Sequence, residues 1–353
     1  MDKNIMKLLI ITQKVDKNDD LLGFFHGWIN EFAKQCQQVT VICLYMGKYD
    51  LPKNVKVLSL GKEKRLSKIL YLYNFYCYII QERKNYTHVF VHMNPIYVLL
   101  GGLFWRLNNK KIALWYNHRK GGSIMFFIAH FINKIFYTAK SSFTSHMKKS
   151  IMMPAGIDTE KFTINKIAQR EPNSILFLGR ISPVKNIHML IVAAKILDVR
   201  GINFKITICG DTTERDRNYY KQIFEESTDL VKRGKIFFIK GVTNMITPEL
   251  YSKNEIFVNL TKAGSFDKTI LESILCGCFP IICNKDFGDI FHDSMYKAVF
   301  FNEKNIEDLA NKLESAIKID QNTRESFILD ISEKIKQQHS IEILTDKLFE
   351  EIK

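Results

Sequence analysis

The sequence predicts an α/β protein built from two doubly wound domains in series. Short runs of β-branched and other apolar residues alternate with longer helical stretches, which is the pattern of strands and helices. The strand runs are apolar almost throughout, as expected for parallel strands that helices cover on both faces. After Gly156 the alternation starts again, and 353 residues leave room for two domains. Ligands in such folds bind at the carboxyl ends of the strands, here in a cleft between two facing domains.

The first half contains predicted strands separated by helices, which makes neighbouring strands parallel. The predicted strands are Lys7–Thr12, Gln38–Leu44, Val55–Leu58, Thr87–His92 and Lys111–Trp115. The predicted helices between them are Leu22–Gln37, Lys64–Arg83 and Ile96–Leu107.

The second half repeats the scheme. The predicted strands are Ser174–Leu178, Lys205–Cys209, Ile236–Lys240, Ile256–Asn259, Pro280–Cys283 and Ala298–Phe301. The predicted helices are Asn186–Arg200, Arg217–Arg233, Thr247–Lys253, Lys268–Cys276, Ile306–Ile319 and Asn322–Gln338. We therefore expect Rossmann-like domains at 1–155 and 156–338, joined by a linker around 154–171. A last helix, Ile341–Ile352, lies in the segment 339–353. It packs either on the second domain or, by crossing back, on the first.

Positive charge is concentrated in the first half. The chain has a formal net charge of +14, and residues 1–150 hold 23 Lys and Arg against 8 Asp and Glu. Such a surface is either a solvated basic face or one that meets anionic lipid or a phosphorylated acceptor. No nucleic-acid-binding motif is present, so nucleic acid is not an expected partner.

Several features favour a cytoplasmic protein. The apolar run near the N-terminus is too short for a signal peptide and reads as a strand. The most apolar window, 88–105, is interrupted by His92, Asn94 and Pro95 and is a poor membrane span. The pair Cys276-Gly-Cys278 has no second pair at ligand spacing, so we expect packing cysteines and no metal.

The first candidate motif is a cationic loop after a predicted strand. Arg180 and Lys185 follow Gly179 and precede a helix. A diphosphate needs fixed positive charge and backbone donors, which such a loop supplies. Taken alone, the pattern fits a surface turn at least as well.

The second candidate motif runs from Asn259 to Pro280. A small-residue loop at 263–267 leads into a helix that starts at Lys268 or Thr269, where free amides cradle a phosphate. Glu272 lies about one turn into this helix, where its carboxylate accepts both ribose hydroxyls. Alternatively, Glu272 stands there only because the helix dipole favours a negative charge near the start of a helix.

The order of these motifs, with glycines at Gly210 and Gly241 after two further strands, resembles the C-terminal domain of GT-B glycosyltransferases of the retaining family 4. The similarity runs from about residue 153 to 280 and includes Pro154-Ala-Gly-Ile-Asp158, which looks like the family's linker. The resemblance implies a metal-independent hexosyl transfer from a UDP- or GDP-sugar to a lipid-linked or surface polysaccharide, as in lipopolysaccharide or capsule biosynthesis. No cofactor is implied.

The resemblance also implies residue roles. Arg180 and Lys185 would neutralise the diphosphate, Glu272 would bind the ribose, and Gly241-Val242 would lie beside the base. One position departs from the family, which has a glutamate where this chain has Gly264, followed by Ser265, Phe266 and Asp267. That glutamate contacts the donor sugar in the family. Asp267 either reaches the sugar from the same loop or caps the helix.

The first domain offers fewer signals. Its first loop carries Asp16, Gly23 and His26, and the resemblance implies that Gly23 lets this loop approach the donor phosphates while Asp16 and His26 face the cleft. The resemblance makes His118, after the strand Lys111–Trp115, the residue beside the reactive carbon of the sugar. Asn94 is a further cleft residue.

Two aromatic, basic stretches, 62–76 and 125–136, suit either a membrane surface or core-facing helices with a basic outer face. The first reading predicts a peripheral protein on the inner face of the plasma membrane. The resemblance leaves other functions of this fold open, namely a sugar-nucleotide epimerase, a sugar phosphorylase or a catalytically silent binding protein, the last because of Gly264.

Overall fold

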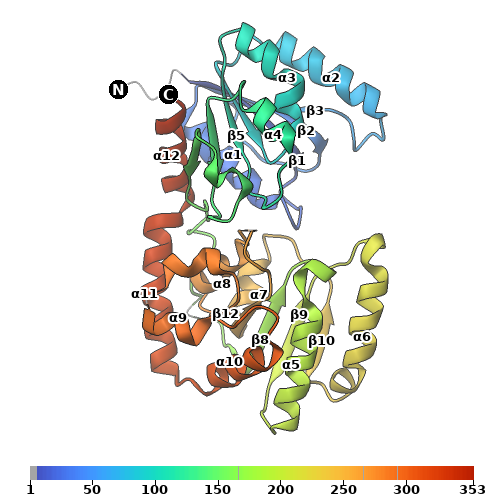
Figure 1. The fold of residues 1–353 in the computed structure, drawn as a ribbon, viewed down its shortest axis with the longest axis vertical. Helices are drawn as coiled ribbons and strands as arrows, with labels where there is room; N and C mark the ends of the chain where they lie inside the picture. Colours follow the sequence, from blue (N-terminus) through green and yellow to red (C-terminus); the bar gives the residue numbers. More distant parts are fainter. Residues whose placement is uncertain (1–5, 166, 265, 292) are drawn as a thin grey trace. The chain divides into compact units, whose positions relative to one another are not determined.

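A computed structural model describes residues 6–165, 167–264, 266–291 and 293–353. The chain divides into two compact units. Unit 1 consists of Met1–Gly156 and Ser340–Lys353, and unit 2 of Ile157–His339 (Figure 1). Each unit has its own parallel sheet and its own core.

Within its described residues, unit 1 is built on a seven-stranded sheet of order β3-β2-β1-β4-β5-β6-β7. Every neighbouring pair is parallel. The strands are β1 (Lys7–Val15), β2 (Gln38–Met46), β3 (Val55–Ser59), β4 (His88–His92), β5 (Lys111–Trp115), β6 (Lys134–Tyr137) and β7 (Ser150–Met152).

Helices cover both faces of this sheet, as the almost continuously apolar strands require. One face packs on α1 (Gly23–Gln35) and α12 (Ile341–Ile352). The other face packs on α2 (Lys68–Gln81), α3 (Ile96–Leu107) and α4 (Ser123–Ile128). Alternate residues of one strand serve the two cores: Leu8 and Ile10 face α1, whereas Leu9 and Ile11 face α2 and α3.

The C-terminal helix α12 is part of unit 1 although the whole of unit 2 precedes it in sequence. Its buried side chains Leu344 and Leu348 join the same core as Trp28 of α1. The Trp28 indole N–H donates to the carbonyl of Gly156, at 2.9 Å. A Cβ on Gly156 would lie 2.3 Å from a Leu344 methyl group, so only glycine fits where the chain leaves the unit.

Unit 2 contains, in its described part, a parallel five-stranded sheet of order β10-β9-β8-β11-β12. Its strands are β8 (Glu171–Leu178), β9 (Lys205–Cys209), β10 (Ile236–Ile239), β11 (Asn254–Asn259) and β12 (Phe279–Ile282). Its α-helices are α5 (Ile187–Val199), α6 (Arg217–Lys232), α7 (Thr247–Ser252), α8 (Thr269–Leu275), α9 (Asp293–Val299), α10 (Ile306–Lys318) and α11 (Gln321–His339). Short 3₁₀ helices are η1 (Phe143–His146) in unit 1, and η2 (Pro183–Lys185), η3 (Glu214–Asp216) and η4 (Lys285–Ile290) in unit 2.

The structure corrects one predicted element and adds others. The predicted strand Ala298–Phe301 is wrong, because α9 continues to Val299 and only Phe300 forms a single bridge, to Ile282. The strands β6 and β7 and the short helix α4 are additions, since runs of three to six residues carry too little periodicity to be recognised. Helix α2 starts at Lys68 rather than Lys64, because Ser67 caps it by accepting from the Leu70 N–H.

Both sheets change winding direction at one position. The chain passes from β1 to β3 in one direction and from β4 to β7 in the other, so the switch in unit 1 lies between β1 and β4. The equivalent switch in unit 2 lies between β8 and β11. Doubly wound sheets bind ligands outside the strand ends at such switches. Among the described residues, none of the helices is both long and apolar enough to span a bilayer.

Candidate functional site

The loops after β8 and β9 approach each other closely in unit 2. Gly179 donates its N–H to the carbonyl of Cys209, at 3.0 Å, and Ile181 donates to the carbonyl of Asp211, at 2.9 Å. A Cβ on Gly210 would lie 1.9 Å from the carbonyl oxygen of Gly179. No side chain fits there, so Gly210 sets the position of the loop that carries Arg180.

We expect Gly210→Ala to lower the stability of unit 2 by about 2 kcal/mol or more, because the added methyl group collides with backbone rather than with a flexible side chain. Thermal unfolding of the purified chain measures this. Gly201→Ala is the matched control, since Gly201 also has a positive φ, of +71°, but a Cβ there meets nothing within 4 Å. Equal melting temperatures for the two variants would contradict the role of Gly210.

Lys185 and Asp267 form an ion pair across the switch between β8 and β11. The Lys185 Nζ lies 2.5 Å from Asp267 Oδ2 and 3.1 Å from the Thr261 hydroxyl. Asn259, the last residue of β11, donates its amide to the same carboxylate oxygen, at 2.9 Å, and the Thr269 hydroxyl donates to the other oxygen, at 2.7 Å. The loop that follows β11 is thereby tied to the loop that follows β8.

These contacts explain the charge state of Asp267. Burial by itself would raise the pKa of this carboxyl, but the positive charge of Lys185 and the hydrogen bonds around the carboxylate hold the pKa well below its ordinary range. Asp267 is therefore a carboxylate whose two oxygens are both engaged. Sequence reasoning left a sugar contact and a helix cap open for Asp267, and the structure shows bonds to its own loop and to Lys185.

Arg180 differs from Lys185 in its surroundings. It is exposed, and none of the described residues hydrogen-bonds or pairs with its guanidinium. Lys185 ends the turn η2, and the next residue, Asn186, adopts a left-handed conformation with φ of 51°. The Asn186 side chain donates to the carbonyl of Leu260, at 3.0 Å, which fixes the loop against β11. One cation is thus held in place and the other faces solvent.

Glu272 is buried one turn into α8, with 5% of its surface exposed. The hydroxyl of Tyr251, which is fully buried, points at its carboxylate from 3.4 Å. Burial raises the pKa of Glu272 above its ordinary value, and the positive charges of Lys268 and Lys161 oppose this rise. Burial likewise lowers the pKa of the Lys268 amine, opposed by Glu272. The carboxylate is held by cations and a phenol rather than by solvent.

The remaining loop residues in unit 2 also have defined places. Gly264 has φ of +106° and donates its N–H to Asp286, at 2.8 Å, so this backbone favours glycine where the family has glutamate. The Phe266 ring packs on Phe287, with centroids 4.3 Å apart. Ser265 lies outside the described residues.

The third loop of unit 2 follows β10 and carries Gly241 and Val242, both half-buried. A Cβ on Gly241 would lie 2.8 Å from a carboxylate oxygen of Asp211. The loops after β9 and β10 therefore also lie side by side. The structure thus brings Gly210, Gly241, Lys185, Thr269 and Glu272 to one end of a single sheet.

In unit 1, the loop after β1 is held by its own acidic residues. Asp16 accepts from the Asn18 N–H, at 3.1 Å, and its side chain packs on Gly47, where a Cβ would come within 2.2 Å. Gly23 is the buried first residue of α1. The His26 ring accepts at Nε2 from the Asp50 N–H, at 3.0 Å, and burial and the charge of Lys17 lower its pKa. His26 therefore binds within its own unit as a neutral imidazole.

At the end of β4, Met93 has φ of 60°, a rare conformation for a residue with a side chain. Its neighbour His92 is buried and stacks on Phe25, with ring centroids 4.0 Å apart. Asn94 is half-buried and its carbonyl accepts from the Tyr97 N–H. Backbone strain of this kind concentrates at functional loops.

His118 follows β5 and is exposed, with its ring 5.4 Å from that of Tyr116 in a T-shaped arrangement. Its backbone is fixed, because its carbonyl accepts from the Phe143 N–H, at 2.9 Å. The preceding Asn117 accepts at its side-chain oxygen from the N–H groups of Thr138 and Ala139. The loop is therefore rigid while the imidazole stays accessible.

Sequence reasoning missed residues that hold this site. Thr261 and Asn117 bond to residues distant in sequence, and Asn259 bonds across its own loop to Asp267, so no sequence motif marks these three residues. Lys161 bonds to the Asn244 side chain and its charge acts on Glu272. Its place three residues after Asp158, in the linker motif, is a signal that would have found it.

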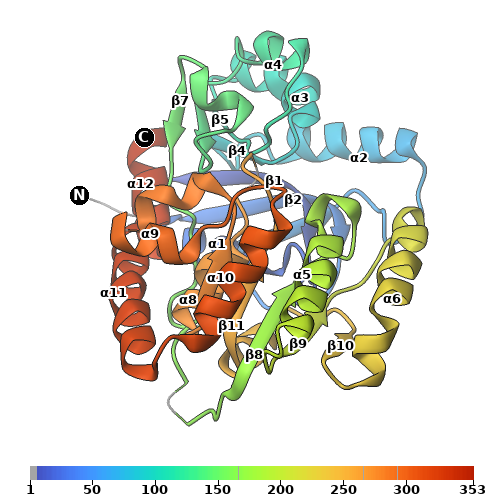
Figure 2. The ribbon, with the colours of Figure 1, turned by 60° about the horizontal axis from the view of Figure 1, so that its bottom comes forward.

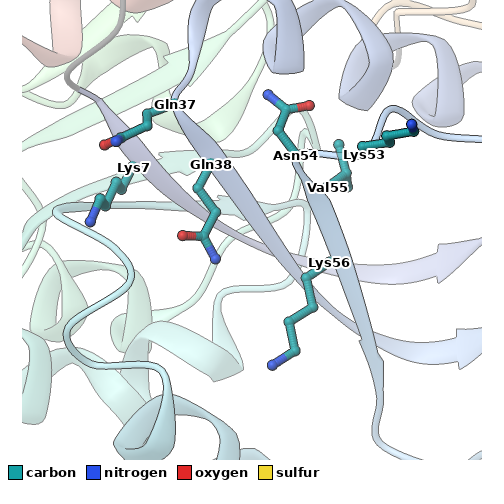
Figure 3. A pocket seen from close by; sticks show the side chains of 7 residues that line it. All are labelled: Lys7, Gln37, Gln38, Lys53, Asn54, Val55 and Lys56. Atoms are coloured by element: carbon teal, nitrogen blue, oxygen red, sulfur yellow. The ribbon is translucent and has the colours of Figure 1, made fainter.

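A surface pocket of about 330 Å³ lies in unit 1, at the end of the sheet where the strands begin (Figure 3). Lys7 and Gln38 at the start of β1 and β2, and Lys56 near the start of β3, contribute to its lining. Because doubly wound folds bind ligands at the other ends of the strands, we do not assign this pocket to the site. Among the described residues, no group of three His, Cys, Asp or Glu side chains is placed to hold a metal ion.

Comparison with known proteins identifies the domain. Residues 158–331 match the family model of glycosyl transferases group 1. The capsular polysaccharide biosynthesis glycosyltransferase CapM of Staphylococcus aureus is 24% identical over 212 residues, and the alignment covers 55% of this chain and 51% of that protein. The chain thus matches about half the length of this curated relative.

Solved structures resemble the chain over nearly its whole length. HepE from Anabaena in complex with UDP and glucose has a TM-score of 0.74 at 12% identity, covering 98% of both chains. A variant of S. aureus TarM in complex with α-GlcNAc-glycerol and UDP also has a TM-score of 0.74 at 12% identity, covering 98% of this chain and 100% of that one. Residues 158–331 thus match the glycosyl transferases group 1 model, and the chain as a whole has the GT-B fold.

Proposed function

We propose that this protein is a retaining, metal-independent glycosyltransferase of family 4. It moves a hexosyl group from a UDP- or GDP-sugar to a hydroxyl of a lipid-linked or cell-surface polysaccharide. The observation that carries the proposal is the group at the switch of the unit 2 sheet, where Lys185, the Gly210 backbone contact and the buried Glu272 lie at one end of the strands. This group lies within the matched domain.

The arrangement suits a nucleoside diphosphate. Arg180 is exposed, and Lys185 in the same loop is held in place by Asp267. The loop therefore offers two positive charges to the negative charge that develops on the leaving diphosphate. Glu272, kept in place by Tyr251, accepts hydrogen bonds from ribose hydroxyls. Backbone of the loop at Gly241 and Val242 contacts the base. His118, whose ring is exposed and whose neighbour Asn117 accepts from the Thr138 N–H, is the residue of unit 1 that we assign to the sugar.

Two similar proteins support the choice of substrates. CapM is named for capsular polysaccharide biosynthesis, and HepE was solved with UDP and glucose. We therefore place UDP-sugars first among donors and a growing polysaccharide, of the capsule or lipopolysaccharide type, first among acceptors.

A donor screen tests this function. The purified chain is heated with a panel of UDP- and GDP-sugars, and we expect one of them to raise the melting temperature, since a ligand at a hundred times its Kd stabilises by about 2.7 kcal/mol. The stabilising donor is then incubated with saccharide acceptors and the free nucleotide is measured. Nucleotide release that depends on acceptor supports the transferase. Epimerised donor without acceptor, or binding without turnover across the panel, supports the epimerase or the silent binding protein instead.

A further inference from the structure

The outer surface of unit 1 has an apolar patch formed by α2, α3 and α4. Five side chains of α2 that share one helix face are exposed, and they are Ile69, Leu72, Tyr73, Tyr76 and Ile80. They stand at positions i, i+3, i+4, i+7 and i+11, which places them in one stripe. The core side of α2 carries the buried Phe75 and Ile79. The helix is therefore apolar on the core side and on the solvent side.

Helix α3 repeats this arrangement. Its exposed stripe contains Ile96, Leu99, Leu103 and Leu107, with Leu103 60% and Leu107 75% exposed. Its other side is buried and includes Trp105. Arg106 is the only charged residue in its sequence. A helix that is apolar all round is normally buried or lies in lipid. We therefore expect the exposed apolar side of α3 to contact protein or lipid rather than water.

The two stripes belong to one surface. The Tyr76 hydroxyl donates to the carbonyl of Leu100, at 3.1 Å, and Phe75 packs on Tyr97 and Trp105, so α2 and α3 lie side by side. Helix α4 continues the layer with exposed Phe126 and Phe127. All three helices cover the same face of the sheet, which places their outer sides on one surface (Figure 2). Contiguous apolar patches of this kind mark interaction sites.

Positive charge surrounds the patch. Exposed Lys62, Lys64 and Lys68 lie at the start of α2, and Arg119 and Lys120 precede α4. The sequence contains no Asp or Glu from residue 83 to 157. The nearest carboxylates are engaged, Glu82 with Lys56 at 2.6 Å and Glu63 with the Ser59 hydroxyl at 2.8 Å. The surface thus combines exposed apolar side chains with cations at two of its borders, before α2 and before α4.

We propose that the patch docks unit 1 onto an anionic lipid surface. Aromatic and aliphatic side chains enter the acyl boundary while the lysines and arginines meet the head groups. A second copy of the chain is a poorer occupant, because a symmetric contact through this patch would bring the same cations together with too few carboxylates to offset them. For the proposed transferase, docking would deliver a lipid-linked acceptor. The docking itself does not require donor or turnover.

Vesicle co-sedimentation of the full chain tests the proposal. We expect binding to vesicles of phosphatidylcholine with phosphatidylglycerol, and much weaker binding to phosphatidylcholine alone or at high salt. The variant Ile69→Gln, Leu103→Gln, Leu107→Gln should lower the partition coefficient by about tenfold or more, since burying one such side chain corresponds to about that factor. Lys62→Glu, Lys64→Glu, Lys68→Glu should lower it by at least about a hundredfold, because each lost lysine counts roughly fivefold and the added carboxylates are repelled by the anionic surface.

Matched controls lie in unit 2. Val199 is 88% exposed and Leu329 is also exposed, so Val199→Gln with Leu329→Gln removes apolar surface elsewhere. Lys195→Glu, Lys221→Glu, Lys232→Glu reverses the same number of exposed charges. Both controls should bind vesicles as the unchanged chain does, and all variants should unfold at similar temperatures.

Several outcomes overturn the docking surface. The proposal fails if the unchanged chain does not bind the anionic vesicles, or if the patch variants bind them as well as the unchanged chain does. It also fails if light scattering shows an oligomer of the unchanged chain that the apolar patch substitutions dissociate. Turnover with a water-soluble acceptor separates this result from the proposed function. This turnover should be unchanged in both patch variants. A variant that loses vesicle binding but keeps this turnover therefore leaves the transferase proposal unaffected.

Discussion

Replacing Lys185 by Met is expected to lower the rate of sugar transfer by about a hundredfold to a thousandfold, the effect of removing one preorganised stabiliser of transition-state charge. The same change leaves Asp267 as a buried carboxylate without its cation, and the melting temperature should fall as well. Turnover under saturating donor and thermal unfolding are measured on the same preparation.

Two further variants separate the two effects. Arg180→Ala removes an exposed cation, so we expect a similar loss of turnover with an unchanged melting temperature. Lys185→Met combined with Asp267→Asn removes both charges of the pair and should recover much of the stability but none of the turnover. If the double variant regains turnover, Lys185 only holds Asp267 and does not serve the diphosphate.

Ending the chain at His339 should prevent unit 1 from folding. This change removes α12, which contributes Ile341, Leu344, Leu348, Phe349 and Ile352 to the core of unit 1. Each buried side chain of this size contributes about 1.5–3 kcal/mol, so the loss equals or exceeds the whole stability of a typical domain. Limited proteolysis should digest unit 1 and spare residues 157–339, which form a compact unit by themselves.

Adjacent residues of α12 provide a sharper comparison within the intact chain. Leu344 is fully buried, whereas Ile343 is 41% exposed. Leu344→Ser should destabilise unit 1 by several kcal/mol, about 3 or more, because it leaves a cavity and buries a hydroxyl. Ile343→Ser should change the melting temperature little. Equal effects of the two substitutions would show that α12 does not pack as described.

Much of the fold followed from periodicity. Long strands such as β1 and β2 and long helices such as α5 and α6 are apolar in patterns that their burial explains. The short elements β6, β7 and α4 did not follow, because runs of three to six residues carry too little periodicity to be recognised. The strand expected at 298–301 failed for the same reason, since a short apolar run fits a helix equally well.

The site divides in a similar way. Gly179, Arg180, Lys185 and Glu272 were predicted from their places relative to strand ends, and the sheet order brings those ends together. The pairing of Lys185 with Asp267 could not be read from the sequence. It depends on the loop of Lys185 meeting the loop of Asp267, which lies 82 residues later in the chain.

The sequence by itself determined that this protein has two parallel α/β units and that its candidate donor site lies at the strand ends of the second. Alternating apolar runs and strand-end motifs are each contained within a short stretch of sequence. Such short-range patterns are enough to predict the two units and the strand ends at which the candidate site lies. Only the tertiary structure decided that α12 completes unit 1, that Asp267 is bound to Lys185, and that the outer stripes of α2 and α3 form one surface. Each of these depends on packing between residues far apart in the chain, for which no sequence period exists.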